Sequence, residues 1–288
     1  MKYILMLCIG LIWGSQFLLN DMILKSFSPL GLAALRMFFG FITLSVLIFI
    51  LPKERKKKVK LDKKLLVLFI ALGATDAAIP FYLIGYGQTQ LDSAVVAIIL
   101  GIIPVFTAIL QNLVGKGKKS GKWEYVGMAV AFVGLYILID PSADSFSGSF
   151  SGYAAILGAA FCFAWAFMFM DRIPSRISAL HASRFILMIY SIPFLAYWLY
   201  VEGFQLPTDT QAWLSLFILG MFASGIVYLF YIQSVRIAGP TFTSFSNYLV
   251  PLIGTFLGVI FLKEDFTINI AMALVLTILG LIICNRKS

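Results

Sequence analysis

The stretch from Leu72 to Lys116, LGATDAAIPFYLIGYGQTQLDSAVVAIILGIIPVFTAILQNLVGK, occurs twice in this chain in altered form. Moving 147 positions along the sequence from this stretch repeatedly reaches the same residue type. The matching pairs are Leu72 with Leu219, Gly73 with Gly220, Pro104 with Pro251, Leu110 with Leu257 and Lys116 with Lys263. Proline is costly inside a helix, so two prolines in register within long apolar runs indicate a repeat rather than chance. The sequence therefore predicts a first half, residues 2–140, and a related second half, residues 151–285.

Composition places the chain in a lipid bilayer. Hydrophobic residues make up 61% of the sequence, charged residues 12%, and the mean hydropathy is +0.97. A soluble domain cannot bury that much apolar surface. Runs of about 20 apolar residues, the length that crosses a bilayer, recur along the whole sequence. We predict ten transmembrane helices, over residues 3–20, 30–51, 65–84, 93–114, 123–140, 152–170, 182–201, 212–232, 241–262 and 268–284.

The first apolar run is interpreted as a retained helix and not as a signal peptide. It lacks a small-residue cleavage site, and nine further runs follow it.

The positive charges alternate with the predicted spans. With the N-terminus in the cytoplasm, nineteen of the 22 Lys and Arg residues fall on the cytoplasmic side, eight of them in residues 53–64. Only Lys25 and Lys263 fall outside, and Arg36 lies within a span. This asymmetry follows the positive-inside rule and predicts that both termini are cytoplasmic. The net charge of +9 therefore reflects topology and not nucleic-acid binding. Contact of residues 53–64 with anionic lipid is the alternative interpretation of that cluster.

The cysteines and the histidine give no sign of a metal site or a cofactor. Cys8, Cys162 and Cys284 all fall within predicted spans and lack metal-ligand spacing, so we interpret them as packing residues. His181 is the only histidine and is predicted to be a solvated residue in a loop or at a helix start.

Five spans in each half make the two repeats inverted. Because five is an odd number, the second half enters the membrane from the opposite side. Inverted repeats place a binding site near the bilayer midplane, between the halves, and allow alternating access to it. The predicted fold is an all-α integral membrane protein with ten helices in two inverted five-helix repeats.

Several short motifs resemble the EamA family of the drug/metabolite transporter superfamily. In the first half they are Ile12-Trp13-Gly14-Ser15, the segment from Ser28-Pro29 to Leu35-Arg36, and Asp92-Ser93-Ala94 leading to Pro104–Ala108. In the second half, Leu262–Thr267 resembles the Gly-Glu-x-x-Thr segment of that family. The first half departs from this pattern, because Gly115–Lys118 contains no Glu. The resemblance covers nearly the whole chain, and it implies a ten-helix carrier of small metabolites such as amino acids, often moving them outward.

Two charged residues within the spans are candidates for a functional site. Asp76 is the only acid well inside a span and Arg36 the only base. A charge at this depth costs about 2.5–3.5 kcal/mol on insertion scales, so each needs a partner or a wet cavity. Asp76 is a candidate for holding a substrate amine or a coupling proton, and Arg36 for orienting it or binding a carboxylate. The alternative is a mutual ion pair that fixes the second and third spans.

Polar and aromatic residues of the spans complete the predicted site. We expect the cavity to be lined by the first, third and fourth spans and their counterparts, the sixth, eighth and ninth. The candidate substrate-binding residues, besides Asp76, are Trp13, Gln16, Tyr82, Trp165, Tyr228, Tyr231 and Asn247. Pro80, Pro104 and Pro251 are candidates for helix bending at a gate.

The predicted function is a secondary transporter in the inner or plasma membrane that exports small, amphipathic metabolites. The sequence contains no nucleotide-binding loop, so a proton gradient or facilitated flow would drive it. An uptake carrier, a channel and an integral-membrane enzyme are the alternatives. The enzyme is disfavoured because the sequence has no cluster of His, Asp or Cys.

Overall fold

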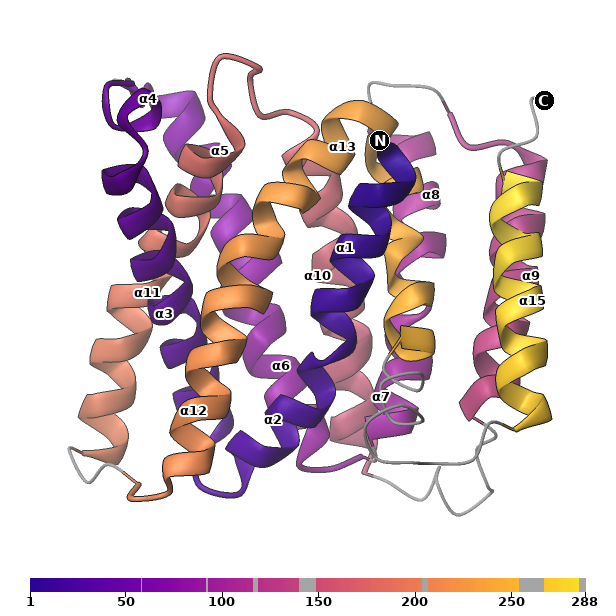
Figure 1. Ribbon diagram of the computed structural model, residues 1–288, viewed down its shortest axis with the longest axis horizontal. Coiled ribbons are helices and arrows are strands. Elements are labelled where there is room, and N and C mark those ends of the chain that lie inside the picture. The colour runs from indigo at the N-terminus through magenta and orange to yellow at the C-terminus, as the bar shows by residue number, and fades with distance from the viewer. Residues whose placement is uncertain are drawn as a thin grey trace.

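The computed structural model of the chain describes residues 1–57, 59–91, 93–115, 119–139, 149–203, 207–253 and 267–284. These residues form helices and short connections, with no strand among them. The helices run mainly up and down past one another, so their ends gather at two opposite ends of the molecule (Figure 1). Outside the described part lie Asp92, Lys116–Lys118, most of the expected linker between the halves, the end of the expected ninth span, and Leu262–Phe266 of the motif before the last span.

In the first half, several expected spans are interrupted helices. The helices of this half are α1 (Lys2–Gly14), α2 (Gln16–Leu24), α3 (Pro29–Ile50), α4 (Pro52–Arg55), α5 (Lys63–Gly73), α6 (Ile79–Gln88), α7 (Ser93–Leu100), α8 (Ile103–Leu113) and α9 (Lys122–Ile139). A π-helical segment, η1 (Ala74–Ala78), joins α5 to α6. Pro80 lies in the first turn of α6 and Pro104 in the first turn of α8, where a missing N–H is tolerated.

The second half repeats this pattern. Its helices are α10 (Phe150–Met170), α11 (Ala179–Glu202), α12 (Thr210–Ile218), α13 (Val227–Ser244) and α15 (Ile268–Cys284), and η3 (Leu219–Ile226), another π-helical segment, joins α12 to α13. Gly239 has a φ of 83° and breaks the helical path just before Pro240. Residues 246–253, including Pro251, are helical again.

Eight helical stretches among the described residues are long and apolar enough to cross a membrane, and α15 is a shorter apolar helix. One of the eight is Thr210–Ser244, which runs through the break at Gly239. The helical and membrane-spanning class is therefore confirmed, whereas the number ten remains a prediction.

The basic segments collect at one end of the bundle. In Figure 1 the start of α1, the end of α15, α4 and the first turns of α5, α9 and α11 all lie at the upper end. The described residues of the basic cluster 53–64 belong to this end. The connection between α2 and α3, which contains Lys25, lies at the opposite end.

Helices α3 and α11 pack together and are tied at both ends by matching contacts. Ser28 begins α3, where its hydroxyl caps the N–H of Gly31 and donates to Glu202 at 2.5 Å. Ser178 begins α11 and donates to Glu54 at 2.6 Å. The capping serine of each helix thus binds a glutamate at or just beyond the far end of the other helix. N-caps of this kind contribute about 1 kcal/mol each.

His181 is one place where the structure corrects the sequence analysis. It lies at the start of α11, as predicted, but only 6% of it is exposed. Its Nε2 lies 3.1 Å from the carbonyl oxygen of Glu54. The contact between α4 and α11 buries a residue that was expected to be solvated.

Matching glycines let each half pack closely on the other. A Cβ added to Gly73 would lie 2.7 Å from the carbonyl oxygen of Ile186 in α11. A Cβ added to Gly220 would lie 2.5 Å from Cβ of Phe39 in α3. Gly73 and Gly220 are one of the pairs 147 positions apart, and each packs on a helix of the opposite half.

Candidate functional site

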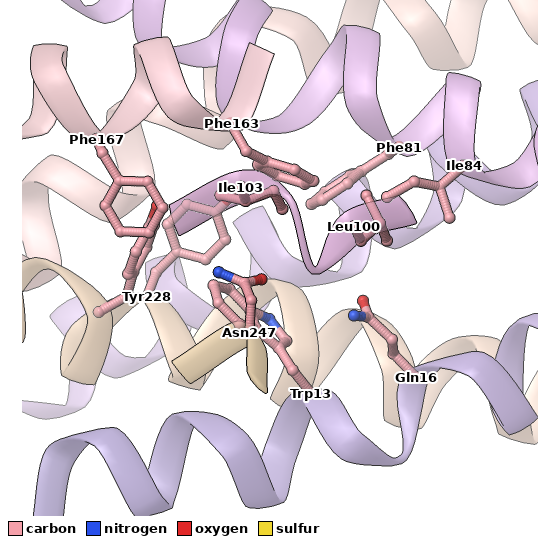
Figure 2. A pocket seen from close by; sticks show the side chains of 11 residues that line it. Trp13, Gln16, Phe81, Ile84, Leu100, Ile103, Phe163, Phe167, Tyr228 and Asn247 are labelled. Carbon is pink, nitrogen blue, oxygen red and sulfur yellow. The ribbon is translucent and has the colours of Figure 1, made fainter. Parts of the chain in front are cut away.

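A cavity lies between the two halves. Its wall is formed by side chains of both: Trp13, Gln16, Phe81, Ile84, Leu100, Ile103, Phe163, Phe167, Tyr228, Tyr231 and Asn247. They come from several helical stretches of the two halves. Figure 2 shows the amide groups of Gln16 and Asn247 pointing toward a wall that carries Phe81 and Phe163.

The lining combines apolar walls with a few polar groups. Aromatic and aliphatic side chains dominate, and the polar groups are two amides, two phenol hydroxyls and the indole N–H of Trp13. This is the usual composition of a small-molecule site. The cavity volume is about 30 Å³, room for about two water molecules. A metabolite would therefore have to move the lining side chains to enter.

The repeat is visible in the lining itself. Three pairs of lining residues are separated by 147 positions, the offset that relates Gly73 to Gly220. The pairs are Phe81 with Tyr228, Ile84 with Tyr231, and Leu100 with Asn247. Equivalent positions of the two halves thus face one cavity, the first half giving an apolar side chain and the second half a polar one.

Hydrogen bonds fix the orientation of three polar lining residues. The indole Nε1 of Trp13 donates to the carbonyl oxygen of Ala223 at 3.1 Å. The hydroxyl of Tyr228 donates to the carbonyl oxygen of Asp76 at 3.0 Å. The amide nitrogen of Asn247 donates to the carbonyl oxygen of Ser244 at 2.8 Å, and among the described residues its amide oxygen has no hydrogen-bond donor.

Tyr231 lies at the centre of an aromatic group. Its ring packs edge-to-face on Trp13 at 5.2 Å, on Phe167 at 5.0 Å and on Tyr228 at 6.0 Å between ring centroids. Edge-to-face pairs of this kind contribute about 0.5–1.5 kcal/mol beyond area burial.

Arg36 lies directly behind this wall. Its guanidinium carbon is 3.7 Å from the centroid of the Phe81 ring, and its Nε donates to the hydroxyl of Ser224 at 3.0 Å. Arg36 is 1% exposed, and its two terminal nitrogens have no hydrogen-bond partner among the described residues. Phe81 touches both the guanidinium and the cavity.

Asp76 is also buried behind the cavity lining, within η1. It is 1% exposed, and its Oδ2 has no hydrogen-bond partner among the described residues. Among the ion pairs of the described residues, none within 4.0 Å joins Asp76 to Arg36. The ion pair weighed as an alternative for these two residues is not formed in this structure.

The structure brings five of the predicted substrate-binding residues to one cavity: Trp13, Gln16, Tyr228, Tyr231 and Asn247. Tyr82 and Trp165 do not line it. Tyr82 is 39% exposed, and Trp165 stacks on Phe169 at 5.6 Å.

Sequence reasoning missed the apolar part of the lining. Phe81, Ile84, Leu100, Ile103, Phe163 and Phe167 resemble ordinary residues of an apolar span. The repeat offset was the available signal for three of them. Subtracting 147 from the positions of Tyr228, Tyr231 and Asn247 gives those of Phe81, Ile84 and Leu100.

In the part of the chain that the structure describes, no group of three or more His, Cys, Asp or Glu residues is arranged to hold a metal ion. The lining of the cavity offers aromatic faces, amides and hydroxyls to a ligand.

Comparison with known proteins gives consistent matches over the whole chain. The model of the EamA-like transporter family matches residues 1–140 and 150–286. The uncharacterized transporter YoaV of Bacillus subtilis is 22% identical over 95% of this chain and 92% of its own length. An uncharacterized transporter of Archaeoglobus fulgidus is 23% identical over 99% of both chains.

Two further matches concern the membrane and the fold. The uncharacterized inner membrane transporter YedA of Escherichia coli is 23% identical over 86% of this chain and 78% of its own length. A solved crystal structure superposes with a TM-score of 0.78 at 16% identity, covering 99% of this chain and 96% of that one.

Proposed function

Because the chain belongs to the EamA-like transporter family, and is thus a multi-pass membrane transporter, we propose that it is a secondary carrier that exports small amphipathic metabolites. The cavity between the halves is the proposed binding site. One observation carries this proposal: equivalent positions of both halves line the cavity. In an alternating-access carrier built from inverted repeats, the binding site lies at the interface of the repeats.

The proposed mechanism uses two inverted five-helix repeats, residues 2–140 and 151–285, in ten spans with both termini cytoplasmic. Two observations support it. The caps that join α3 and α11 are exchanged reciprocally between the halves. The break at Gly239 divides Thr210–Ser244 where a ninth span is expected to begin. In this topology the end of the bundle that carries α4 faces the cytoplasm.

The proposed substrate has one apolar part and one part that forms hydrogen bonds. Trp13, Tyr231 and Phe163 offer aromatic surface, while Gln16 and Asn247 offer amides. Asp76 and Arg36 act from behind the lining, as the groups that carry a coupling proton or meet a charged group of the substrate once Phe81 moves aside.

Anionic lipid is the proposed partner of the basic cluster 53–64. Lys57 and Lys60 of this cluster line a pocket of about 440 Å³ together with Arg176, at the same end of the bundle. Cations gathered beside a membrane surface attract acidic headgroups by about 1 kcal/mol each.

Counterflow in proteoliposomes tests the proposed function. Purified protein is reconstituted and preloaded with a pool of amino acids, amines and small drugs, and uptake of trace label is followed with and without a pH gradient. We expect accumulation of one compound class, weakened by Asn247→Leu in the cavity and unaffected by Tyr136→Phe, which is 49% exposed on α9. Folded protein that supports no counterflow of any class would contradict the carrier.

The direction of transport is tested in a separate experiment. Inside-out and right-side-out vesicles carrying the protein are compared for net flux of the compound that counterflow identifies. Net movement out of the cytoplasmic side supports export, and the opposite result assigns an uptake carrier.

A further inference from the structure

Each π-helical segment contains a carbonyl group that has lost its α-helical donor. In an α-helix the carbonyl of Asp76 would accept from residue 80, which is Pro80 and has no N–H. The carbonyl of Ala223 would accept from Val227, but the N–H of Val227 bonds to the carbonyls of Phe222 and Gly225 instead. A carbonyl displaced from the α-helical pattern in this way can also accept from a side chain.

In both segments the donor is a side chain of the opposite half. The Tyr228 hydroxyl reaches Asp76 at 3.0 Å, and the Trp13 indole reaches Ala223 at 3.1 Å. Asp76 and Ala223 are themselves 147 positions apart, so the two bonds end at equivalent places in η1 and η3. A side chain of the first half thus bonds to the π-helical segment of the second half, and a side chain of the second half bonds to the π-helical segment of the first half.

Both donors also line the cavity. Figure 2 shows Trp13 and Tyr228 on the wall where Asn247 projects. The ring of Tyr231 packs against both of them, at 5.2 Å from Trp13 and 6.0 Å from Tyr228. The two bonds are thus joined through one aromatic group that a substrate would contact.

We propose that Trp13 and Tyr228 are positioning residues that latch η1 and η3 across the interface, so that a substrate entering the cavity releases both segments together. This inference rests on the proposed function. A cavity of about 30 Å³ admits a metabolite only if its aromatic lining moves. Movement of either donor removes a hydrogen bond from a π-helical segment, and the segment is then free to change its path. Because both latches belong to one aromatic group, the two halves respond to one binding event.

Amide hydrogen exchange tests the crossed arrangement without any substrate. Tyr228→Phe removes only a hydroxyl, and we expect exchange to become roughly two- to tenfold faster in residues 74–78 of the first half, the range that the loss of one hydrogen bond gives. Trp13→Phe removes the indole donor, and we expect the same acceleration in residues 219–226 of the second half.

Tyr248→Phe is the matched control. The Tyr248 hydroxyl is also buried and donates to a helix carbonyl, that of Met128 in α9, at 3.2 Å. We expect this control to leave exchange in both π-helical segments unchanged. Acceleration of either π-helical segment by Tyr248→Phe, or no acceleration by Tyr228→Phe and Trp13→Phe, would overturn the latch. If Trp13→Phe does not fold, the isosteric Tyr228→Phe alone decides the result for the first half.

Pulsed electron spin measurements separate a latch from ordinary packing. Spin labels are placed on cysteines at Thr89, just after α6, and Gln211, in the first turn of α12, two exposed positions. Cys8, Cys162 and Cys284 are replaced by alanine in the background protein. We expect Tyr228→Phe to shift the populations of the distance distribution at least twofold, and Tyr248→Phe to leave them as in the parent. Identical distributions in all three proteins would overturn the latch. Neither measurement depends on transport, so a chain that transports nothing would contradict the proposed function and leave the latch to be judged on its own.

Discussion

Arg36 donates from Nε to the hydroxyl of Ser224 at 3.0 Å, so a buried cation of α3 is held by the π-helical segment of the opposite half. The same guanidinium packs on the Phe81 ring that lines the cavity. One side chain therefore joins the interface of the halves to the wall of the proposed site.

Loss of the Ser224 hydroxyl is expected to destabilise this junction. Ser224→Ala leaves the buried Nε of Arg36 without its acceptor, which costs about 1–3 kcal/mol. Ser45→Ala is the control, because Ser45 accepts from Arg184 in a half-exposed setting. Thermal unfolding in detergent checks both variants. A midpoint for Ser224→Ala equal to that of the parent would show that Arg36 finds another partner.

A methyl group at Gly220 is expected to push the halves apart. The added Cβ would lie 2.5 Å from Cβ of Phe39, so α3 and η3 must separate, at a cost of about 1–3 kcal/mol. Gly158→Ala is the matched control, since its Cβ would meet only Leu83 at an ordinary 3.4 Å. Unfolding midpoints again provide the measurement, and equal midpoints for the two variants would contradict close packing at Gly220.

Glu54 is expected to make stability depend on pH at the end of the bundle that carries α4. Burial opposes ionisation of Glu54, but hydrogen bonds from Lys57 and Ser178 outweigh it and lower the pKa of this carboxyl. A lowered folded pKa gives stability that is present above the unfolded value of about 4.3 and is lost as the pH falls through the folded pKa. Glu54→Gln should therefore be less stable than the parent at pH 7, and the difference in unfolding free energy between the two proteins should decrease below about pH 4.

Ser178→Ala provides the control for this assignment. It removes one of the two hydrogen bonds that lower the pKa of Glu54, so this pKa should be lowered less than in the parent. The stability that ionised Glu54 still contributes should then be lost at a higher pH than in the parent. The difference in unfolding free energy between the parent and Glu54→Gln is measured from pH 7 to pH 3. If it stays constant, titration of Glu54 is not its source.

Asp76→Asn is expected to separate transport from a proton gradient. The substitution keeps the size of the side chain and removes the group proposed to carry the proton. If transport is proton-coupled, counterflow should persist while accumulation driven by a pH gradient is lost. Asp76→Asn that transports at the rate of the parent protein from pH 5 to pH 8 would show that Asp76 carries no coupling proton.

Much of the fold follows from local sequence. Apolar length predicted the helices, and Ser28-Pro29 correctly predicted the start of α3. The first π-helical segment falls where Pro80 removes a donor. The second, η3, contains no proline, only Gly220, Ser224 and Gly225 among apolar residues, so nothing local indicated it.

The site was harder to predict than the fold. Polar residues in apolar spans are conspicuous, which is why Tyr228, Tyr231 and Asn247 were found. Phenylalanine is favourable against lipid, against protein and around a cavity alike, so Phe81 and Phe163 carry no signal of their own. Tyr82 was selected for its hydroxyl, yet its neighbour Phe81 faces the cavity because the helix turns about 100° per residue.

The exchanged glycine contacts also bear on how the protein is made. Gly73 gains its packing partner only when Ile186 has been synthesised, more than a hundred residues later. At about 5–20 residues per second, the ribosome needs on the order of ten seconds for that stretch. During that interval the surface around Gly73 has no helix packed against it, and the carbonyl of Asp76 lacks its hydrogen bond from Tyr228. Folding of this transporter is therefore completed only after its second half has been made, and a stall in translation between the halves leaves the first half exposed to quality control.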